Sequence, residues 1–393
     1  MQEEFDVVVV GGGPGGTMAA KFAAEEGLKV LVLEKDREIG IPVRCGEAVG
    51  GAGLKEFIPN PDGMPMIAST VKTFRLISPN GTIVESSAEG SGYVLHRKMF
   101  DQELALMAIR SGAKIQTRSY VTGLTFDGDY VSGVKYRYQS EEERTVKAKV
   151  VVAADGVEGR VGRWAGFKTV IKMKDMETCY QAHLANIDVK DGVIDFFLST
   201  EKCPGGYIWV FPKGDGQANV GIGISGKYSG KKSPKKYLDE YIAEKFPNAS
   251  EITTTLGGVP CTESMSELSG NGIVLVGDTA HQVNPMTGGG IVNAMKAGRI
   301  AGKVIGEAIR KNDVSKKMLS NYDKEWKKTV GKLNDRFYKV KEFTAKLTDG
   351  QLNQTAEILV KMPPEKRTLF NVFKTAVRFQ PKLIWEVTKI FLG

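Results

Sequence analysis

The chain has 393 residues, of which 41% are hydrophobic and 25% charged, so it has the composition of a folded globular protein and is too long for one compact core. No stretch approaches the roughly 18 uninterrupted apolar residues of a membrane span, and the short N-terminal apolar run lacks the pattern of a signal peptide. The four cysteines are scattered without a C-x-x-C pair, which argues against zinc and iron–sulfur sites and agrees with a reducing cytosol.

The net charge of +8 is concentrated at the C-terminal end of the chain. Residues 311–393 carry 18 Lys and Arg against 9 Asp and Glu, and the rest of the chain is almost neutral. Two interpretations stay open: a solvated helical surface, or a surface that contacts anionic lipid headgroups or an acidic protein. Nucleic-acid binding is not indicated, because no nucleic-acid motif accompanies the charge.

The N-terminal segment predicts a strand, a glycine-rich turn, a helix and a second strand. The first strand, at residues 5–10, runs into a G-x-G-x-x-G made by Gly11, Gly13 and Gly16. The second strand ends on Glu34. Such glycines let a pyrophosphate approach the amides at a helix N-terminus, and the acid can accept hydrogen bonds from a ribose. The pattern predicts a dinucleotide site; the alternative is a purely structural strand–helix–strand turn.

The middle of the chain predicts two further groups of elements. A loop at residues 39–53 precedes a hairpin, a helix and three strands that return to the first sheet, at residues 70–77, 82–86, 100–109, 114–118, 131–138 and 146–153. Four alternating segments then predict an antiparallel sheet with a later helix, at residues 178–187, 193–198, 207–211, 218–224 and 234–246. This order indicates a second domain inserted into the first.

The last third predicts one buried strand followed by helices. The strand covers residues 273–278, and the helices cover residues 288–308, 316–347 and 352 onward, with breaks at Pro363-Pro364 and Pro381. The predicted fold class is α/β, with a Rossmann-type nucleotide-binding domain, an inserted antiparallel-sheet domain for substrate and a helical C-terminal region. The predicted boundaries are residues 1–65, 90–170 and 265–310 for the first domain, 66–89 and 171–264 for the second, and 311–393 for the C-terminal region.

Three separated segments resemble the FAD-binding sequences of the flavoprotein hydroxylase fold. In chain order they are the glycine turn with Glu34, the run from Val150 to Gly156 and on to Arg160, and Gly277-Asp278-Thr279-Ala280-His281 with Pro285 and Gly288-Gly289-Gly290. The resemblance spans roughly residues 1–310. It implies that the cofactor is FAD rather than NAD alone.

The resemblance implies positions for the contacts with FAD. Asp278 would lie beside a flavin ribose hydroxyl, and residues 288–291 would place a helix N-terminus near the pyrimidine edge of the flavin ring. Val121 would meet the adenine, and Arg97 would lie close to the cofactor at a helix start. Asp155 stays open between a cofactor contact and a cap of the following helix. The full set of expected cofactor residues is Gly11, Gly13, Gly15, Gly16, Glu34, Lys35, Arg44, Cys45, Gly46, Ala48, Arg97, Val121, Asp155, Asp278, Pro285, Gly288, Gly290 and Ile291.

Two further stretches resemble the geranylgeranyl reductases, most closely the archaeal enzymes that saturate the isoprenoid chains of digeranylgeranylglycerophospholipids. They are residues 204–212, which read P-x-x-Y-x-W-x-F-P, and Arg44-Cys45-Gly46-Glu47. The resemblance implies reduction of C=C bonds in a prenylated glycerophospholipid, by a hydride from flavin N5 and a proton. It places Cys45 beside the flavin ring as a candidate catalytic residue; a positioning role and a merely buried thiol are the alternatives.

Aromatic residues at alternate positions indicate a surface for an apolar substrate. In a strand, Tyr207, Trp209 and Phe211 point to one face, so they are predicted substrate residues; an ordinary two-sided core strand is the alternative. Asn371 is a further substrate candidate, in a C-terminal segment where aromatic residues alternate with cations. That segment would close a lipid tunnel, bind the phosphate headgroup or rest on a membrane surface, or simply pack as helices.

Two other functions compete with the reductase. An FAD monooxygenase of the same fold would consume oxygen, and a prenyl-binding carrier related to the GDP-dissociation-inhibitor fold would hold no flavin. The electron donor stays open among ferredoxin, nicotinamide and deazaflavin, and no metal is expected. The expected location is the cytoplasm, with peripheral contact with the inner face of the cell membrane as an open alternative.

Overall fold

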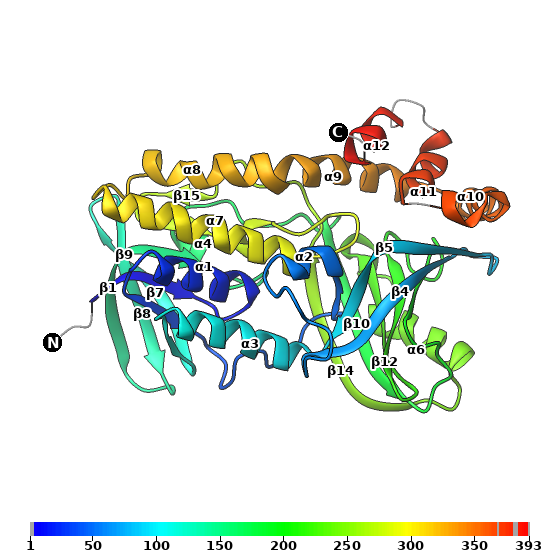
Figure 1. The fold of residues 1–393 in the computed structure, drawn as a ribbon, viewed down its shortest axis with the longest axis horizontal. Coiled ribbons are helices and arrows are strands. Elements are labelled where there is room, and N and C mark those ends of the chain that lie inside the picture. The colour runs from blue at the N-terminus through cyan, green and yellow to red at the C-terminus, as the bar shows by residue number, and fades with distance from the viewer. Residues whose placement is uncertain (1–3, 368, 380–383, 392–393) are drawn as a thin grey trace. The chain divides into compact units, whose positions relative to one another are not determined.

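The computed structural model describes residues 4–367, 369–379 and 384–391. Its chain forms two compact units, each assembled from three separate segments (Figure 1). The first unit is Met1–Val43, Arg97–Val170 and Thr262–Asp335, and the second is Arg44–His96, Ile171–Cys261 and Arg336–Gly393. The sequence-based boundaries, which kept residues 44–65 with the first domain and set residues 311–393 apart, stay predictions.

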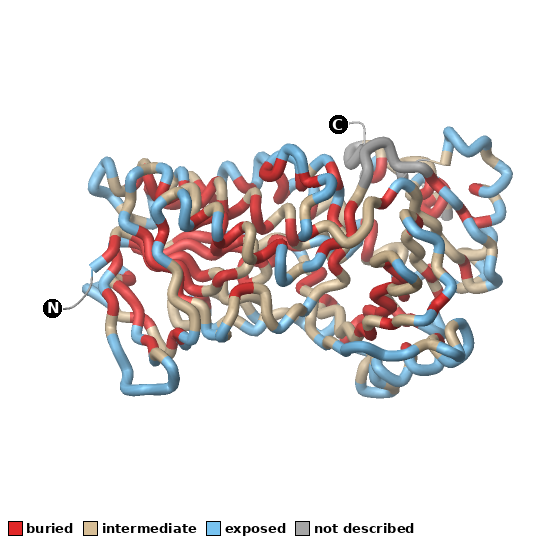
Figure 2. Tube along the Cα trace, turned by 60° about the horizontal axis from the view of Figure 1, so that its bottom comes forward, coloured by how far each residue is buried: buried red, intermediate tan, exposed pale blue. Residues whose placement is uncertain are grey.

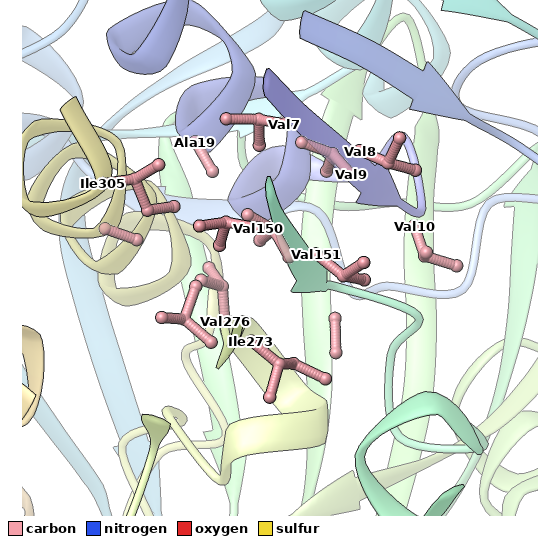
Figure 3. Packing of buried hydrophobic residues seen from close by; sticks show 14 of the residues in the cluster. Val7, Val8, Val9, Val10, Ala19, Val150, Val151, Ile273, Val276 and Ile305 are labelled. Carbon is pink, nitrogen blue, oxygen red and sulfur yellow. The ribbon is translucent and has the colours of Figure 1, made fainter. Parts of the chain in front are cut away.

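The first unit is built on an eight-stranded sheet whose central strands are parallel. Six strands follow one path, in the order β15 (Ser269–Gly270), β16 (Ile273–Leu275), β9 (Glu143–Ala153), β1 (Glu4–Val10), β2 (Val30–Leu33) and β6 (Lys114–Gln116). The antiparallel pair β7 (Ser119–Asp127) and β8 (Tyr130–Tyr138) joins the sheet through β9. Central strands of this kind are covered on both faces, so they read as continuous apolar runs. Figure 3 shows Val7, Val150 and Ile305 in the resulting core.

Two helices of the first unit pack closely because one of them, Ile291–Arg310, carries glycines at four-residue spacing. These helices are α1 (Pro14–Glu25), α3 (Arg97–Arg110), α4 (Val161–Trp164), α7 (Ile291–Arg310) and α8 (Lys316–Trp326). A Cβ at Gly298 would lie 2.4 Å from the Gly15 carbonyl oxygen, and one at Gly302 would lie 2.7 Å from the Ala23 nitrogen. The backbones of α1 and α7 therefore meet directly, and Figure 1 shows the two helices side by side.

The second unit contains another eight-stranded sheet. Its order is β14 (Ser250–Pro260), β10 (Met176–Ala185), β13 (Gln217–Ser225), β12 (Tyr207–Gly214), β11 (Val193–Phe197), β4 (Ile67–Ile77), β5 (Ile83–Leu95) and β3 (Ala48–Gly50). The pairing is antiparallel except between β11 and β4, which run parallel. The predicted antiparallel sheet is confirmed, with this one parallel pair in it, because β4 comes from an earlier segment and has no tight turn to β11.

One face of the second sheet forms an aliphatic core. Ile208, Val210 and Ile222 lie in it and pack with Leu238 and Tyr241 of α6 (Pro234–Lys245). The remaining helices of this unit are α2 (Gly51–Lys55), α5 (Gly226–Ser229), α10 (Asp349–Lys361), α11 (Leu369–Ala376) and α12 (Ile384–Phe391), and α9 (Lys332–Thr344) begins in the first unit and ends in the second. The opposite face carries aromatic and polar side chains.

The predicted fold class is confirmed, and several predicted elements are corrected. The loop expected at residues 39–53 contains β3 and the start of α2, because short elements leave too few residues to show a period. The strand β7 was not predicted. The helix expected from residue 288 begins at Ile291, and the helix expected at 316–347 is divided by a π turn at Lys327–Gly331. The break at Pro363-Pro364 is confirmed, and Pro381 lies outside the described residues.

Figure 2 shows buried residues concentrated inside the structure and exposed residues mainly along its outer segments. The central strands of the first sheet are buried along most of their length, whereas the edge strand β14 of the second sheet is largely exposed. In the part of the chain that the structure describes, no helix is both long and apolar enough to cross a membrane.

Candidate active site

A backbone cradle lies where β1 passes into α1. Gly11 has a left-handed φ of 105°, and a Cβ there would lie 2.3 Å from the Ala154 carbonyl oxygen. A Cβ at Gly16 would lie 2.0 Å from the Gly11 carbonyl oxygen. Gly13 is the N-cap of α1, and Pro14 fills its first position, where a missing N–H is tolerated. The helix N-terminus therefore presents bare backbone, which is the geometry that holds a pyrophosphate.

Glu34, which follows β2, is held by hydrogen bonds at the edge of this cradle. One oxygen of Glu34 accepts a hydrogen bond from the Gly12 amide at 2.7 Å, and the other accepts one from the Asp36 amide at 2.9 Å. These bonds fix the carboxylate next to the glycine turn. Its contact with a ribose stays a prediction. Lys35 is half-exposed instead and pairs with Asp36 at 3.1 Å.

Asp155 follows β9 and uses its two carboxylate oxygens differently. Its Oδ2 accepts hydrogen bonds from the Arg160 and Val161 amides at 2.6 and 2.9 Å, so the capping interpretation is right for that oxygen. Its Oδ1 is buried and has no hydrogen-bond partner among the described residues. Burial raises the pKa of Asp155, although the two amides oppose the shift. An acceptor left bare beside the cradle suits a ligand hydroxyl.

Asp278 and the N-terminus of α7 are brought together. Asp278 lies in a 3-10 turn, Gly277–Ala280, directly after β16. A Cβ at Gly290, the N-cap of α7, would lie 3.3 Å from the Asp278 Oδ1. Burial raises the pKa of Asp278 to about 6, and the charge of Arg97 opposes that shift. The carboxylate therefore lies near a positive helix end. Its contact with a flavin ribose stays a prediction.

Arg97 has a partner of its own at the start of α3. Its guanidinium binds Asp101 through two hydrogen bonds of 3.0 and 2.9 Å, and both side chains are largely buried. This ion pair compensates a cation at a helix N-terminus, which is otherwise unfavourable. Its contact with a cofactor stays a prediction.

The other residues expected near the cofactor surround the same turns. Pro285 is buried, and Gly288 has a left-handed φ of 70°, between Asp278 and the first residue of α7, Ile291. Val121 is buried on β7 opposite Tyr136. The residues of the first unit thus fit FAD: a glycine cradle, two carboxylates and a bare acceptor lie at the carboxyl ends of parallel strands.

The aromatic residues of β12 form one cluster, as their alternation predicts. Trp209 and Phe211 stack with ring centroids 6.1 Å apart, and Tyr207 meets Trp209 edge-on at 5.9 Å. Phe196 of β11 packs against Tyr207 and Phe211 at 5.4 and 5.5 Å. The Trp209 indole donates a hydrogen bond to Gln181 of β10 at 2.8 Å. The four rings form an apolar cluster, and Gln181 satisfies the one polar atom of its tryptophan.

Glycines on β13 make room for this cluster. A Cβ at Gly221 would lie 2.3 Å from the Trp209 ring, and one at Gly223 would lie 3.4 Å from the Cys179 sulfur. The strand β13 lies between β10 and β12. Because Gly221 and Gly223 have no side chains, the indole of Trp209 can lie across β13.

The loop that carries Cys45 lies on this aromatic face. The Gln181 amide donates to the Cys45 carbonyl oxygen at 3.0 Å, and a Cβ at Gly46 would lie 3.1 Å from the Phe211 ring. Cys45 is half-buried, and its sulfur accepts a hydrogen bond from the Glu47 amide at 3.2 Å. Arg44 is exposed, and Ala48 begins β3.

A buried ion pair anchors the end of that loop. Glu47 has a left-handed φ of 74°, and its Oε2 lies 2.6 Å from the Lys213 Nζ. Each side chain of the pair is 7% exposed. Asn219 donates to the same Glu47 oxygen and to the Gly46 carbonyl oxygen, and Lys213 also donates to the Leu95 carbonyl oxygen at 3.0 Å. The loop is therefore held at a fixed place on the sheet.

Sequence reasoning missed three polar residues of this site: Gln181, which accepts the hydrogen bond of Trp209, and Lys213 and Asn219, which hold Glu47. The alternation of β10 and β13 could have placed Gln181 and Asn219 on this face, but nothing in the sequence pairs those strands with β12. The structure places Asn371 on α11, where its side chain donates to the Lys366 carbonyl oxygen at 2.7 Å; its contact with substrate stays a prediction. Within the described residues, no group of three His, Cys, Asp or Glu side chains could hold a metal ion.

Comparison with known proteins identifies relatives over the whole length. Residues 175–259 match the model of the geranylgeranyl reductase catalytic domain, and residues 5–194 match that of the pyridine nucleotide-disulphide oxidoreductases. The digeranylgeranylglycerophospholipid reductase of Methanocella arvoryzae is 47% identical, with 98% of this chain and 99% of that protein covered. The reductase of the same name from Methanosarcina acetivorans is 43% identical, with 100% and 97% covered.

A solved structure agrees with these relatives. The geranylgeranyl bacteriochlorophyll reductase-like protein of Thermoplasma acidophilum superposes with a TM-score of 0.92 at 37% identity, covering 99% of this chain and 100% of that one. The matched regions include the glycine cradle of the first unit and the aromatic strand of the second. The chain belongs to the geranylgeranyl reductase family of FAD-dependent oxidoreductases.

Proposed function

We propose that this protein reduces isoprenoid C=C bonds in the geranylgeranyl chains of archaeal membrane phospholipid precursors, and so acts as a digeranylgeranylglycerophospholipid reductase. The observation that carries the proposal is the aromatic face of β12 within the match to the reductase catalytic domain. The full-length identity of 47% to a reductase of that name supports the same substrate class.

The chemistry explains why such a face is needed. An isolated trisubstituted alkene is a poor hydride acceptor, so reduction needs both a hydride and a proton at adjacent carbons. When bound, reduced FAD supplies the hydride. The residues of the second unit have the remaining tasks: Trp209 and Phe211 bind the apolar chain and exclude water, and the anchored loop at Cys45 positions the reacting bond.

The C-terminal helices support a further part of the proposal, contact with a membrane surface from the cytoplasmic side. The Trp385 side chain on α12 is 62% exposed, and cations lie between the aromatic residues of α11 and α12. We expect Trp385→Ala to reduce co-sedimentation with anionic liposomes severalfold, whereas Tyr120→Ala, which also removes an exposed aromatic residue, leaves it unchanged. Equal sedimentation of both variants would contradict the contact.

Anaerobic incubation of the dithionite-reduced protein with unsaturated archaeal phospholipid, followed by mass spectrometry, tests the reaction. The proposal predicts successive gains of two hydrogen atoms. The competing monooxygenase predicts no product without air and a gain of one oxygen atom in its presence. A purified protein without flavin would favour the prenyl-binding carrier.

A further inference from the structure

An acidic side chain lies at one end of the aromatic face without an assigned role. Glu177 is on β10, two residues from Cys179 and four from Gln181, so it shares their face of the strand. Its Oε2 would lie 3.2 Å from a Cβ at Gly206, directly before Tyr207. Because Gly206 has no side chain, the carboxyl group fits beside the first residue of the aromatic strand.

The carboxyl group of Glu177 is left without a partner. Within the part of the chain that the structure describes, its Oε2 is buried and makes no hydrogen bond, although the residue as a whole keeps some accessible surface. A charged carboxylate in that position would lose its hydration without gaining a hydrogen bond, so burial favours the neutral acid. A neutral carboxyl is a hydrogen-bond and proton donor.

The groups around Glu177 act on its protonation in opposite directions. Desolvation raises its pKa to about 8, the charge of Asp175 adds to that shift, and the charges of Lys341 on α9 and Lys227 on α5 oppose it. Burial also raises the pKa of the neighbouring Cys179 thiol and Tyr207 phenol, each from a higher ordinary value. Among these three neutral groups, Glu177 is the strongest acid.

We propose that Glu177 is the catalytic acid that donates the proton to the isoprenoid double bond, an inference that rests on the reductase function proposed above. One C–H bond forms at each alkene carbon as the π bond is lost. The hydride and its two electrons come from reduced FAD, and the proton comes from the Glu177 carboxyl group, whose O–H bond breaks. The resulting carboxylate regains a proton from water before the next turnover.

The first test replaces the carboxyl by an amide of the same shape. We expect Glu177→Gln to lower kcat for anaerobic lipid reduction by about 100-fold or more, the usual size of a general-acid contribution. KM, FAD content and reduction by dithionite should change less than about threefold. The matched control is Glu251→Gln, an exposed glutamate of β14, which should retain full kcat. A Glu177→Gln kcat within about threefold of wild type would overturn the proposal.

The second test keeps Glu177 and changes its surroundings. A required neutral acid predicts a wild-type kcat that falls as pH rises through about 8. In Asp175→Asn, loss of the charge that raises the pKa of Glu177 should move this fall to lower pH. The amide oxygen can still accept the hydrogen bonds that Tyr338 and Lys341 donate to Asp175 at 2.9 and 3.3 Å. A profile that does not move would contradict the proposal even if Glu177→Gln fails to fold.

A third test measures the protonation of Glu177 directly, without any turnover. Infrared spectra of the apoprotein should contain a carboxyl C=O stretch that disappears above about pH 8 and is absent from Glu177→Gln. No such band in the wild type would overturn the neutral acid. If the wild type does not reduce the lipid, the reductase proposal fails; if it does and Glu177→Gln equals it, only the role of Glu177 fails.

Discussion

The two units build their candidate sites from different parts of the chain. The first unit uses backbone and carboxylates in the turns that follow parallel strands, as at Gly11, Asp155 and Asp278. The second uses side chains at alternate positions within strands, as at Gln181 and Trp209. A turn after a strand is contiguous in sequence, whereas a face of a sheet collects residues from strands far apart in the chain. A nucleotide site is therefore easier to predict from sequence motifs than a complete substrate face, of which a motif shows only one strand.

The same difference predicts how each site tolerates change. In the first unit, a methyl group added at Gly11 or Gly16 would clash with backbone atoms that have no room to move. In the second unit, the sensitive contacts are buried polar pairs that orient a loop. Four measurements would sharpen this comparison, and their expected effects decrease from a loss of bound FAD to a small change in the pH dependence of stability.

The largest effect is expected at the glycine cradle. Gly16→Ala would place a Cβ 2.0 Å from the Gly11 carbonyl oxygen, so the turn must open and lose its pyrophosphate geometry. We expect bound FAD, measured by the absorbance of the purified protein, to fall by more than about tenfold. Gly123→Ala is the matched control, since a Cβ there has no neighbour within 4 Å. Normal FAD content in Gly16→Ala would contradict the view that the first site depends on bare backbone.

The next effect concerns the anchor of the loop at Cys45. Lys213→Met leaves the Glu47 carboxylate buried without its cation, which destabilises a protein by about 3–5 kcal/mol. Denaturant unfolding should show this loss, and the double variant Lys213→Met/Glu47→Gln should recover part of it. If the double variant is no more stable than the single one, the ion pair does not hold the loop.

A smaller effect is expected at Cys45 itself. Cys45→Ser keeps the hydrogen bond from the Glu47 amide but replaces the sulfur, so we expect turnover to fall by about tenfold with normal FAD content. Cys203→Ser, at a buried thiol of the aliphatic core, should alter stability rather than turnover. Full turnover in Cys45→Ser would remove the thiol from the chemistry.

The smallest effect is a pH dependence of the apoprotein. Because the pKa of Asp278 is raised to about 6 in the folded state, the folded chain binds more protons than the unfolded chain between about pH 4 and 6. Its stability should therefore fall as pH rises through that window, by at most about 3 kcal/mol. Asp278→Asn should flatten this part of the profile, and the exposed control Asp129→Asn should not. An unchanged slope in Asp278→Asn would refute the shift.

Much of the first site could be predicted from the sequence. The glycine turn, Glu34 and the loop before α7 are local patterns, and the structure places them at the same edge of one sheet. The position of Asp155 after a strand could be predicted. That one of its oxygens caps the next helix while the other makes no hydrogen bond could not be predicted, because this depends on where the Arg160 and Val161 amides lie.

Less of the second site could be predicted. The common face of Tyr207, Trp209 and Phe211 follows from alternation alone. The bond from Trp209 to Gln181 requires the register of β10, β13 and β12, and the anchor at Glu47 requires a backbone with positive φ. Such pairings are set by long-range packing, which a single sequence does not display.

The most direct test of the proposed reaction is anaerobic stopped-flow spectroscopy of the flavin. The reduced protein is mixed with a digeranylgeranyl phospholipid or with its fully saturated counterpart. Hydride transfer to the isoprenoid chain predicts flavin oxidation with the unsaturated lipid and none with the saturated one. Flavin that stays reduced with both lipids and is oxidised only when oxygen is admitted would contradict it.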